Sequence, residues 1–103
     1  MKTGIELIAE ERQRQIEIEG WTIAHDKQEH DDEDLAQAAA CCARPWYSRN
    51  MQDNGLPERW PWDKKWWKPA KEPKLPGFAG RIRELQKAGA LIAAEIDRLN
   101  SLK

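Results

Sequence analysis

Acidic side chains gather between His30 and Asp34, directly before an alanine-rich run. Asp and Glu are favoured in the first turn of a helix because they face the positive end of its dipole, and alanine has the highest helix propensity. The pattern therefore predicts a helix over about 31–44 that ends before Pro45. Asp31 and Asp34 then share a face, where two carboxylates can hold a hard divalent cation such as Mg²⁺. A solvated acidic helix start without a metal is the alternative interpretation.

Two His-Asp pairs stand five residues apart, His25-Asp26 and His30-Asp31. Imidazole and carboxylate groups together can form a transition-metal site. The spacing matches no familiar zinc motif, so a surface histidine beside a carboxylate is the alternative reading. The second histidine, His30, is also four residues from Asp34 and shares a helical face with it.

The composition predicts one folded domain over residues 1–103. The net charge is −1, and 40% of the residues are hydrophobic, which argues against a disordered chain and against a general polyanion binder. We find no apolar run long enough to span a bilayer and no signal-peptide pattern. Because the two cysteines, Cys41 and Cys42, are adjacent, a disulfide framework is excluded within one chain. These features predict a cytoplasmic protein that does not enter a membrane.

Helical patterns lie at both ends of the chain. The first covers about 2–19, with Thr3 and Glu6 as a capping box and Gly20 as the stop. Its charged run is either a solvent face or part of a cleft for an anionic ligand. Residues 21–29 are expected to form a connection.

The last helix is predicted over about 79–102, because apolar side chains recur there every three or four residues. We expect these positions to form its apolar face: Ile82, Leu85, Ala88, Gly89, Ile92, Ile96 and Leu99. A glycine inside a helix costs about 1 kcal/mol against alanine, so we expect Gly89 to mark a close helix crossing.

The middle of the chain, about 45–78, has a different composition. It contains all six prolines and five of the six tryptophans, which excludes one long helix and argues against a free linker. We expect an ordered, irregular loop whose indoles pack on the helices or on a partner chain. The alternative is a stacking platform for a nucleobase, with Lys64, Lys65 and Lys68 for phosphates. The predicted fold is therefore an all-α helical bundle with a Pro/Trp-rich loop, completed by oligomerisation to a dimer or tetramer.

Several segments together resemble phage and prophage proteins of the MazG-like group, which are often labelled dATP/dGTP diphosphohydrolase-like. They are spread over most of the chain's length and are ERQRQ (11–15), EGWT (19–22), HD (25–26), DLAQAA (34–39), WPW (60–62), WWKP (66–69) and RELQKAGALIAAEI (83–96). The resemblance implies an all-α nucleoside triphosphate pyrophosphohydrolase that releases a nucleoside monophosphate and pyrophosphate. Members carry EExxE on one helix and ExxD on the next.

Laid on this chain, the first family motif falls on His30, Asp31 and Asp34, and the second on Glu84 and Lys87. His30 replaces an acid, and Lys87 puts an ammonium where the family has a metal-binding carboxylate. The resemblance thus implies that Mg²⁺, or Mn²⁺ in its place, is held by Asp31, Asp34 and Glu84.

The same resemblance implies roles around that metal. Glu33 or Glu95 would orient the attacking water. The substrate-binding residues would be Arg14, His30, Lys87, Trp62, Trp66 and Lys68. The alternative function is a non-catalytic phage accessory protein of the same fold that binds a protein partner or a nucleotide. Nucleic-acid binding is disfavoured at this net charge.

Overall fold

The computed structural model describes residues 1–72 and 77–103, and these residues form four α-helices and two short 3-10 helices. The helices are α1 (Gly4–Glu17), α2 (Ile23–Glu29), α3 (Asp34–Ala43), η1 (Trp46–Ser48), η2 (Lys64–Trp66) and α4 (Ala79–Asn100). An isolated bridge between Met51 and Pro57 adds the one strand-like pairing among the described residues. The all-α prediction is therefore confirmed at this level. None of the described helices has the length and apolarity that crossing a bilayer demands.

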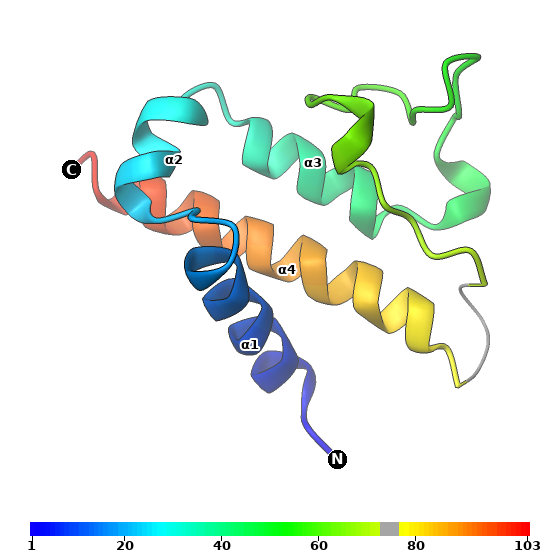
Figure 1. The fold of residues 1–103 in the computed structure, drawn as a ribbon, viewed down its shortest axis with the longest axis horizontal. Helices are drawn as coiled ribbons and strands as arrows, with labels where there is room; N and C mark the ends of the chain where they lie inside the picture. Colours follow the sequence, from blue (N-terminus) through cyan, green and yellow to red (C-terminus); the bar gives the residue numbers. More distant parts are fainter. Residues whose placement is uncertain (73–76) are drawn as a thin grey trace.

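Helix α4 is the element on which the other three α-helices pack. Figure 1 shows α3 running antiparallel to α4 along one side, while α1 crosses α4 on the other side. The core between α3 and α4 consists of small residues around two leucines: Leu35, Ala38, Ala39, Ala88, Leu91 and Ala94. Because alanine side chains are short, the two helices approach closely and hold their ends in fixed relative positions.

Local signals explain the start of α1. Both hydrogen bonds of the predicted capping box between Thr3 and Glu6 are present. Gly20 follows the helix with a φ of 75°, a conformation that glycine adopts without strain. These details confirm the predicted helix start and stop.

Two boundaries differ from the prediction. Residues 23–29, expected to be a connection, form α2, because the Thr22 hydroxyl accepts a hydrogen bond from the backbone N–H of His25 and caps a helix. Helix α3 begins at Asp34, after Glu33 with a φ of 64°, rather than at Asp31. Asp31 therefore lies in the preceding turn and does not share a helical face with Asp34.

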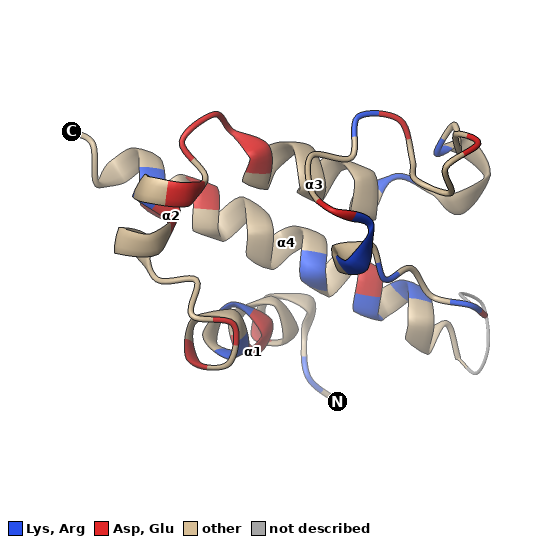
Figure 2. Cartoon of the chain, turned by 45° about the horizontal axis from the view of Figure 1, so that its top comes forward, with Lys and Arg blue, Asp and Glu red and all other residues tan. Residues whose placement is uncertain are grey.

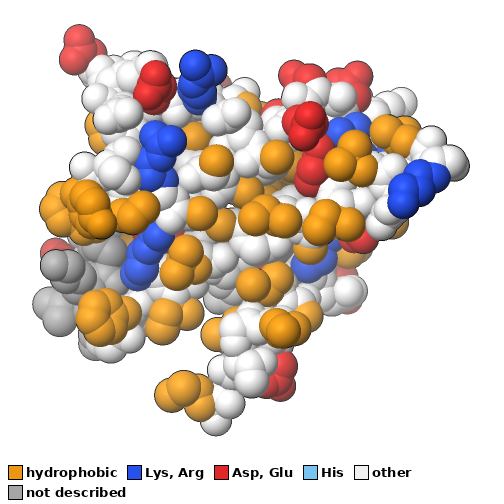
Figure 3. All heavy atoms as spheres, turned by 180° about the vertical axis from the view of Figure 1, so that it is seen from behind, with side chains coloured by type: hydrophobic (Ala, Val, Ile, Leu, Met, Phe, Trp, Pro, Cys, Tyr) orange, Lys and Arg blue, Asp and Glu red, His pale blue; other side chains and the backbone are white. Residues whose placement is uncertain are grey.

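The expected apolar face of α4 is the more exposed one. Ile82, Leu85, Ile92, Ile96 and Leu99 are each 45–53% exposed, and Figure 3 shows hydrophobic side chains spread across this side of the molecule. The face that packs inward carries mainly alanines, Leu91 and charged residues. Most of the predicted apolar face of α4 is therefore left uncovered within one chain, although Ala88 is buried.

Gly89 marks a close helix crossing, as predicted. A Cβ atom placed on Gly89 would lie 2.5 Å from Cδ1 of Ile8, which reaches across from α1. Glycine is thus required for α1 and α4 to cross at this distance.

The loop after α3 packs several of its indoles on the helices, which confirms that part of the prediction. Trp60 and Trp62 are partly buried against the α3–α4 core, together with Trp21. Trp46 is 54% exposed and Trp66 is 39% exposed. Part of the predicted loop, 73–76, lies outside the described residues.

Candidate functional site

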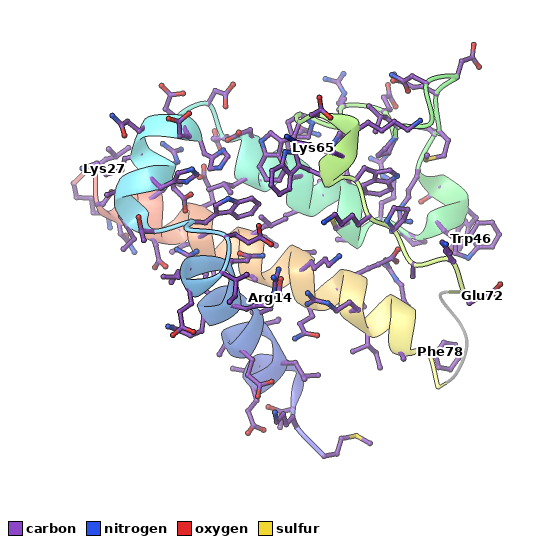
Figure 4. All side chains as sticks on the ribbon, in the orientation of Figure 1. Arg14, Lys27, Trp46, Lys65, Glu72 and Phe78 are labelled. Carbon is purple, nitrogen blue, oxygen red and sulfur yellow. The ribbon has the colours of Figure 1, made fainter. Side chains whose placement is uncertain are left out.

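A buried carboxylate on α1 organises the side chains between α1 and α4. Glu11 is 2% exposed and accepts two hydrogen bonds from Arg14 at 2.9 Å and one from Arg83 at 2.7 Å. Burial by itself opposes ionisation, but the hydrogen bonds and charges of the two arginines outweigh it and lower the pKa of Glu11. The two guanidinium groups are therefore held in place at the edge of α1, where Figure 4 labels Arg14.

A pocket of about 220 Å³ opens beside these arginines, between α1, α4 and the loop. We call it the indole pocket, after the four indoles that line it: Trp21, Trp60, Trp62 and Trp66. The rings of Trp21 and Trp62 meet edge to face with centroids 5.4 Å apart, and those of Trp60 and Trp62 do so at 5.5 Å. Such pairs fix each ring, and the result is a rigid aromatic wall.

Positive charge exceeds negative charge in the indole pocket. Arg14, Arg83, Lys68 and Lys87 line it, against two carboxylates, Glu11 and Glu19. Figure 2 shows several basic positions in the first half of α4, the part of the helix that contains Arg83 and Lys87.

The two lysines are the cations of this pocket that have no carboxylate partner. Within residues 1–72 and 77–103, no carboxylate oxygen lies within 4.0 Å of the ammonium group of Lys68 or Lys87. Lys68 lies over the ring of Trp66 at 6.0 Å, and burial lowers the pKa of Lys87. The pocket thus offers ammonium groups beside aromatic surface, an arrangement suited to an anion that carries a flat ring.

A second pocket of about 500 Å³ adjoins the first. We call it the histidine pocket, after His25 and His30; Asp34 also lines it, and Trp21, Trp62 and Trp66 line both pockets. The two spaces therefore meet along the same three indoles, and a ligand in one is close to the side chains of the other.

Asp34 is held at this meeting point by two donors. Its Oδ2 atom lies 2.6 Å from Nδ1 of His30 and accepts a hydrogen bond of 2.7 Å from the indole N–H of Trp62. The second carboxylate oxygen is buried and has no hydrogen-bond partner among the described residues. Asp34 thereby joins the end of α2, the start of α3 and the loop.

Asp26 lies beside the two histidines and is fully buried. Its nearest polar neighbours are Nδ1 of His25 at 3.2 Å, a guanidinium nitrogen of Arg12 at 3.8 Å and Nε2 of His30 at 3.9 Å. Burial raises the pKa of Asp26, and the neighbouring cations only partly oppose this effect. Sequence reasoning named Asp26 only as part of a weak His-Asp pattern, and nothing in the sequence indicated that this residue is buried.

Glu84, one of the three expected metal ligands, belongs to α4 and is linked through Arg81 to the last turn of α3. Its carboxylate accepts hydrogen bonds from Arg81 at 3.0 Å and from the Ala70 backbone N–H at 2.9 Å, and lies 3.1 Å from Arg49. Arg81 also donates to the carbonyl groups of Cys42 and Ala43, in the last turn of α3. Burial opposes ionisation, but these donors outweigh it and lower the pKa of Glu84.

The Mg²⁺ site implied by the resemblance is therefore not assembled within one chain. Asp34 opens α3, whereas Glu84 is bonded to Arg81, which donates to carbonyl groups at the other end of that helix. The two ends of a ten-residue helix are about 13 Å apart along the axis. Both oxygens of Glu84 are occupied by protein donors, and Asp31 is exposed in the turn before α3. These three residues do not fit a single Mg²⁺ ion in this geometry.

The two expected water-orienting residues lie outside both pockets. Glu33 is exposed at the start of α3, and Glu95 is buried in a two-hydrogen-bond pair with Arg98, at 2.7 and 2.8 Å. The expected substrate-binding residues are brought together: Arg14, Lys68, Lys87, Trp62 and Trp66 line the indole pocket, and His30 lines the adjoining one. Sequence reasoning missed Trp21 as a pocket residue, and it placed Glu11 in a cleft only as one of two alternatives for the charged run of α1.

Comparisons with known proteins identify no relative. No protein-family model, no curated protein and no solved structure matches the chain. What the pocket does must therefore be argued from its own chemistry.

Proposed function

We propose that the chain binds a nucleoside triphosphate, with its base in the indole pocket. The observation that carries the proposal is the presence of several indoles and two ammonium groups without carboxylate partners, Lys68 and Lys87, around one space of about 220 Å³. A nucleobase is flat and aromatic, and it gains about 1–3 kcal/mol by stacking on such a side chain. A triphosphate supplies the negatively charged partner that these two ammonium groups lack.

The arginines support the same ligand. Because Arg14 and Arg83 are both bonded to Glu11, their guanidinium groups are already ordered, and little side-chain entropy is lost when an anion binds. A nucleotide larger than the indole pocket would extend past the shared indoles into the histidine pocket of about 500 Å³. We therefore propose that the lysines and arginines of the indole pocket bind the phosphates, while the shared indoles stack on the base.

Hydrolysis to a nucleoside monophosphate and pyrophosphate is the second candidate. The observation that favours it is the free, buried Oδ1 atom of Asp34, in a residue that lines the pocket next to the proposed nucleotide. Because Asp31, Asp34 and Glu84 do not meet within one chain, we propose no catalytic step through Mg²⁺ or Mn²⁺ at those residues. Binding without turnover is the function that the pocket supports directly.

We also propose that two copies of the chain associate through α4. Five exposed apolar side chains of α4 share one helical face at spacings of three, four and seven residues, which suits a helix-pairing seam: Ile82, Leu85, Ile92, Ile96 and Leu99. Leu35 and Leu91 are the large aliphatic side chains of the chain's own core. More of the large aliphatic side chains of α4 are therefore exposed than are buried in that core. A second copy of the chain offers an identical stripe to cover them.

Tryptophan fluorescence tests the binding proposal. We expect ATP and the four dNTPs to quench the indoles saturably, and the double variant Lys68→Gln/Lys87→Gln to raise the Kd at least tenfold, a loss of about 1.4 kcal/mol. The matched control is Lys27→Gln, which removes one charge on the outer side of α2, away from both pockets (Figure 4). Equal weakening by the control, or no saturable quenching up to about 1 mM, would refute the proposal.

Two further ligands separate the parts of the site. Inorganic triphosphate should bind through the lysines with little change in fluorescence, whereas the uncharged nucleoside should bind weakly and still quench. Pyrophosphate release from the same dNTP panel, with Mg²⁺ or Mn²⁺ present, tests hydrolysis. A well-folded protein that binds dNTPs and releases no pyrophosphate is a binding protein rather than a hydrolase.

A further inference from the structure

Three side chains at one end of α2 can offer ligand atoms to a single ion. The ligand atoms of His25, Asp26 and His30 lie within 4.8 Å of one another. His25 and Asp26 belong to α2, and His30 is its last, capping residue. Asp26 and His30 are four residues apart, so the helix places them on one face. Ligand atoms at about 2.0–2.2 Å from one tetrahedral ion are about 3.3–3.6 Å apart, so a small inward movement of these side chains would let all three reach one ion.

Two of these atoms are buried and unpaired. Asp26 is 0% exposed and His30 is 8% exposed. Oδ2 of Asp26 and Nε2 of His30 have no hydrogen-bond partner among the described residues. The separation between Nε2 of His30 and Oδ1 of Asp26 is 3.9 Å, and that between Oδ2 and Arg12 is 3.8 Å, both too long for a hydrogen bond. Leaving a buried acceptor unpaired costs about 1–3 kcal/mol, so a bound ligand that pairs with these two atoms would stabilise the chain.

Asp34 determines which ring nitrogen of His30 carries the proton. Its carboxylate oxygen is 2.6 Å from Nδ1 and can only accept, so the proton of a neutral ring lies on Nδ1. Nε2 then carries a lone pair, on the side of the ring that faces Asp26. A carboxylate behind a histidine in this way is the usual support of a metal-ligating imidazole.

We propose that His25, Asp26 and His30 bind one divalent first-row transition-metal ion, such as Zn²⁺, Co²⁺, Mn²⁺ or Ni²⁺, and that Asp34 orients His30. Two imidazoles and one carboxylate suit these ions, whereas Mg²⁺ prefers oxygen ligands. The ion neutralises Asp26 and provides the partner that Nε2 of His30 lacks. This site differs from the carboxylate set that the sequence resemblance implies.

The surroundings leave at least one coordination position for a non-protein ligand. His25 and His30 line the histidine pocket of about 500 Å³, which holds water or part of a larger molecule. Three protein ligands beside such an opening are the arrangement of metal sites that exchange ligands, in contrast to closed four-ligand structural sites. The pocket borders the proposed nucleotide site, but the metal proposal does not depend on a nucleotide and is tested without one.

Metal titration of the protein, stripped with a chelator and dialysed, tests the proposal. We expect one Zn²⁺ per chain by calorimetry, and visible absorption bands of histidine-bound Co²⁺ when that ion is used as the probe. His25→Gln and His30→Gln should abolish both signals. Asp34→Asn should weaken binding about 10- to 100-fold, because it removes the carboxylate behind His30. The matched control, Asp53→Asn, changes an exposed carboxylate far from α2 and should bind as the wild type does.

Two controls keep the result unambiguous. Circular dichroism establishes that each variant is folded, and His25→Gln is the mildest change because the His25 side chain is 35% exposed. Wild-type protein that binds neither Zn²⁺ nor Co²⁺, or folded His25→Gln and His30→Gln variants that bind both ions as tightly as Asp53→Asn, would overturn the proposal. A Co²⁺ spectrum that about tenfold excess Mg²⁺ abolishes would also overturn it, because such a site would be made of oxygen ligands.

Discussion

Nδ1 of His30 lies 2.6 Å from a carboxylate oxygen of Asp34, across the turn that joins α2 to α3. The indole N–H of Trp62 donates to the same oxygen, from a position 28 residues further along the chain. One carboxylate therefore ties two helices and the loop together where the indole and histidine pockets meet. Asp34 is the last residue of the acidic stretch that the sequence singled out, but its partners are not the expected acids.

We predict that Asp34→Asn destabilises the chain even in the presence of a chelator. The variant removes the charge that strengthens two hydrogen bonds at a largely buried carboxylate, and bonds to charged groups are each worth about 1.5–3 kcal/mol. Urea unfolding at neutral pH measures the change, which we expect to be a loss of about 2 kcal/mol. Asp53→Asn serves as the control, and an equal effect of both variants would contradict the role given to Asp34.

The pH dependence of stability tests whether the hydrogen bonds to Glu84 lower the pKa of its carboxyl group. Because its pKa in the folded chain lies below the usual 4.5, its ionised form stabilises the fold fully above about pH 4.5. That contribution is lost as the pH falls through the lowered pKa. We therefore predict that the free energy of unfolding decreases between pH 7 and pH 3, and that Glu84→Gln makes this decrease smaller.

The same variant has a second effect at pH 7. It leaves the buried guanidinium of Arg49 and that of Arg81 without their carboxylate, which costs about 3–5 kcal/mol. The variant and the wild type should therefore differ more at pH 7 than at pH 3. Glu72→Gln, which changes an exposed carboxylate (labelled in Figure 4), should leave both the stability and its pH profile unchanged.

Local signals in the sequence were enough to predict α1 and α4. The capping box of Thr3 and Glu6 and the stop at Gly20 involve neighbouring residues, so a single chain segment contains the information. Helix α2 was missed because its seven residues carry little periodicity, and the hydroxyl of Thr22 was not recognised as its cap. The larger aliphatic residues of α4 could be recognised as an apolar face, but their spacing does not indicate that the close approach of α3 selects alanines for the inward face.

The candidate site depended on contacts that no periodicity describes. The loop residues Trp62, Trp66 and Lys68 could be identified as ligand-binding residues from their types, because indoles beside lysines suit nucleotides in any fold. The spatial neighbours of the expected Mg²⁺ ligands could not be predicted in this way. Glu84 occupies the position of a family carboxylate, yet its neighbours in space are Arg49 and Arg81, and their approach is determined by the path of the loop.

We predict that Gly89→Ala is destabilising, although alanine favours a helix by about 1 kcal/mol. The new methyl group would lie 2.5 Å from Cδ1 and 2.7 Å from Cγ1 of Ile8, so either the Ile8 side chain or the crossing of α1 and α4 must shift. Overpacking of this kind typically costs about 1–3 kcal/mol. Urea unfolding of the variant measures the loss.

A double-mutant cycle identifies the cause of that loss. In an Ile8→Ala background the atoms that clash are absent, so Gly89→Ala should there stabilise the chain by up to about 1 kcal/mol. The expected change of sign is specific to this contact. If Gly89→Ala has the same effect in both backgrounds, Ile8 is not what requires the glycine.

The last prediction concerns the apolar seam of α4. If two copies pair along it, Ile92 and Ile96, which are 49% and 53% exposed in one chain, become buried, and a charge at either position is costly. We predict that the wild type sediments as a dimer and that Ile92→Glu/Ile96→Glu sediments as a folded monomer. Ile18→Glu, at a 72% exposed position near the end of α1, is the control for added charge and should remain dimeric.

The stability of these proteins distinguishes pairing from a local effect of the substitutions. Because dimer dissociation is coupled to unfolding, the melting temperature of the wild type should rise with protein concentration, and that of Ile92→Glu/Ile96→Glu should not. The seam residues contribute little to the core of one chain, which contains Leu35, Leu91 and alanines, so the monomeric variant should keep its helical content. A wild type that is monomeric at about 100 µM would leave the exposed seam without a second copy to cover it and would refute the pairing.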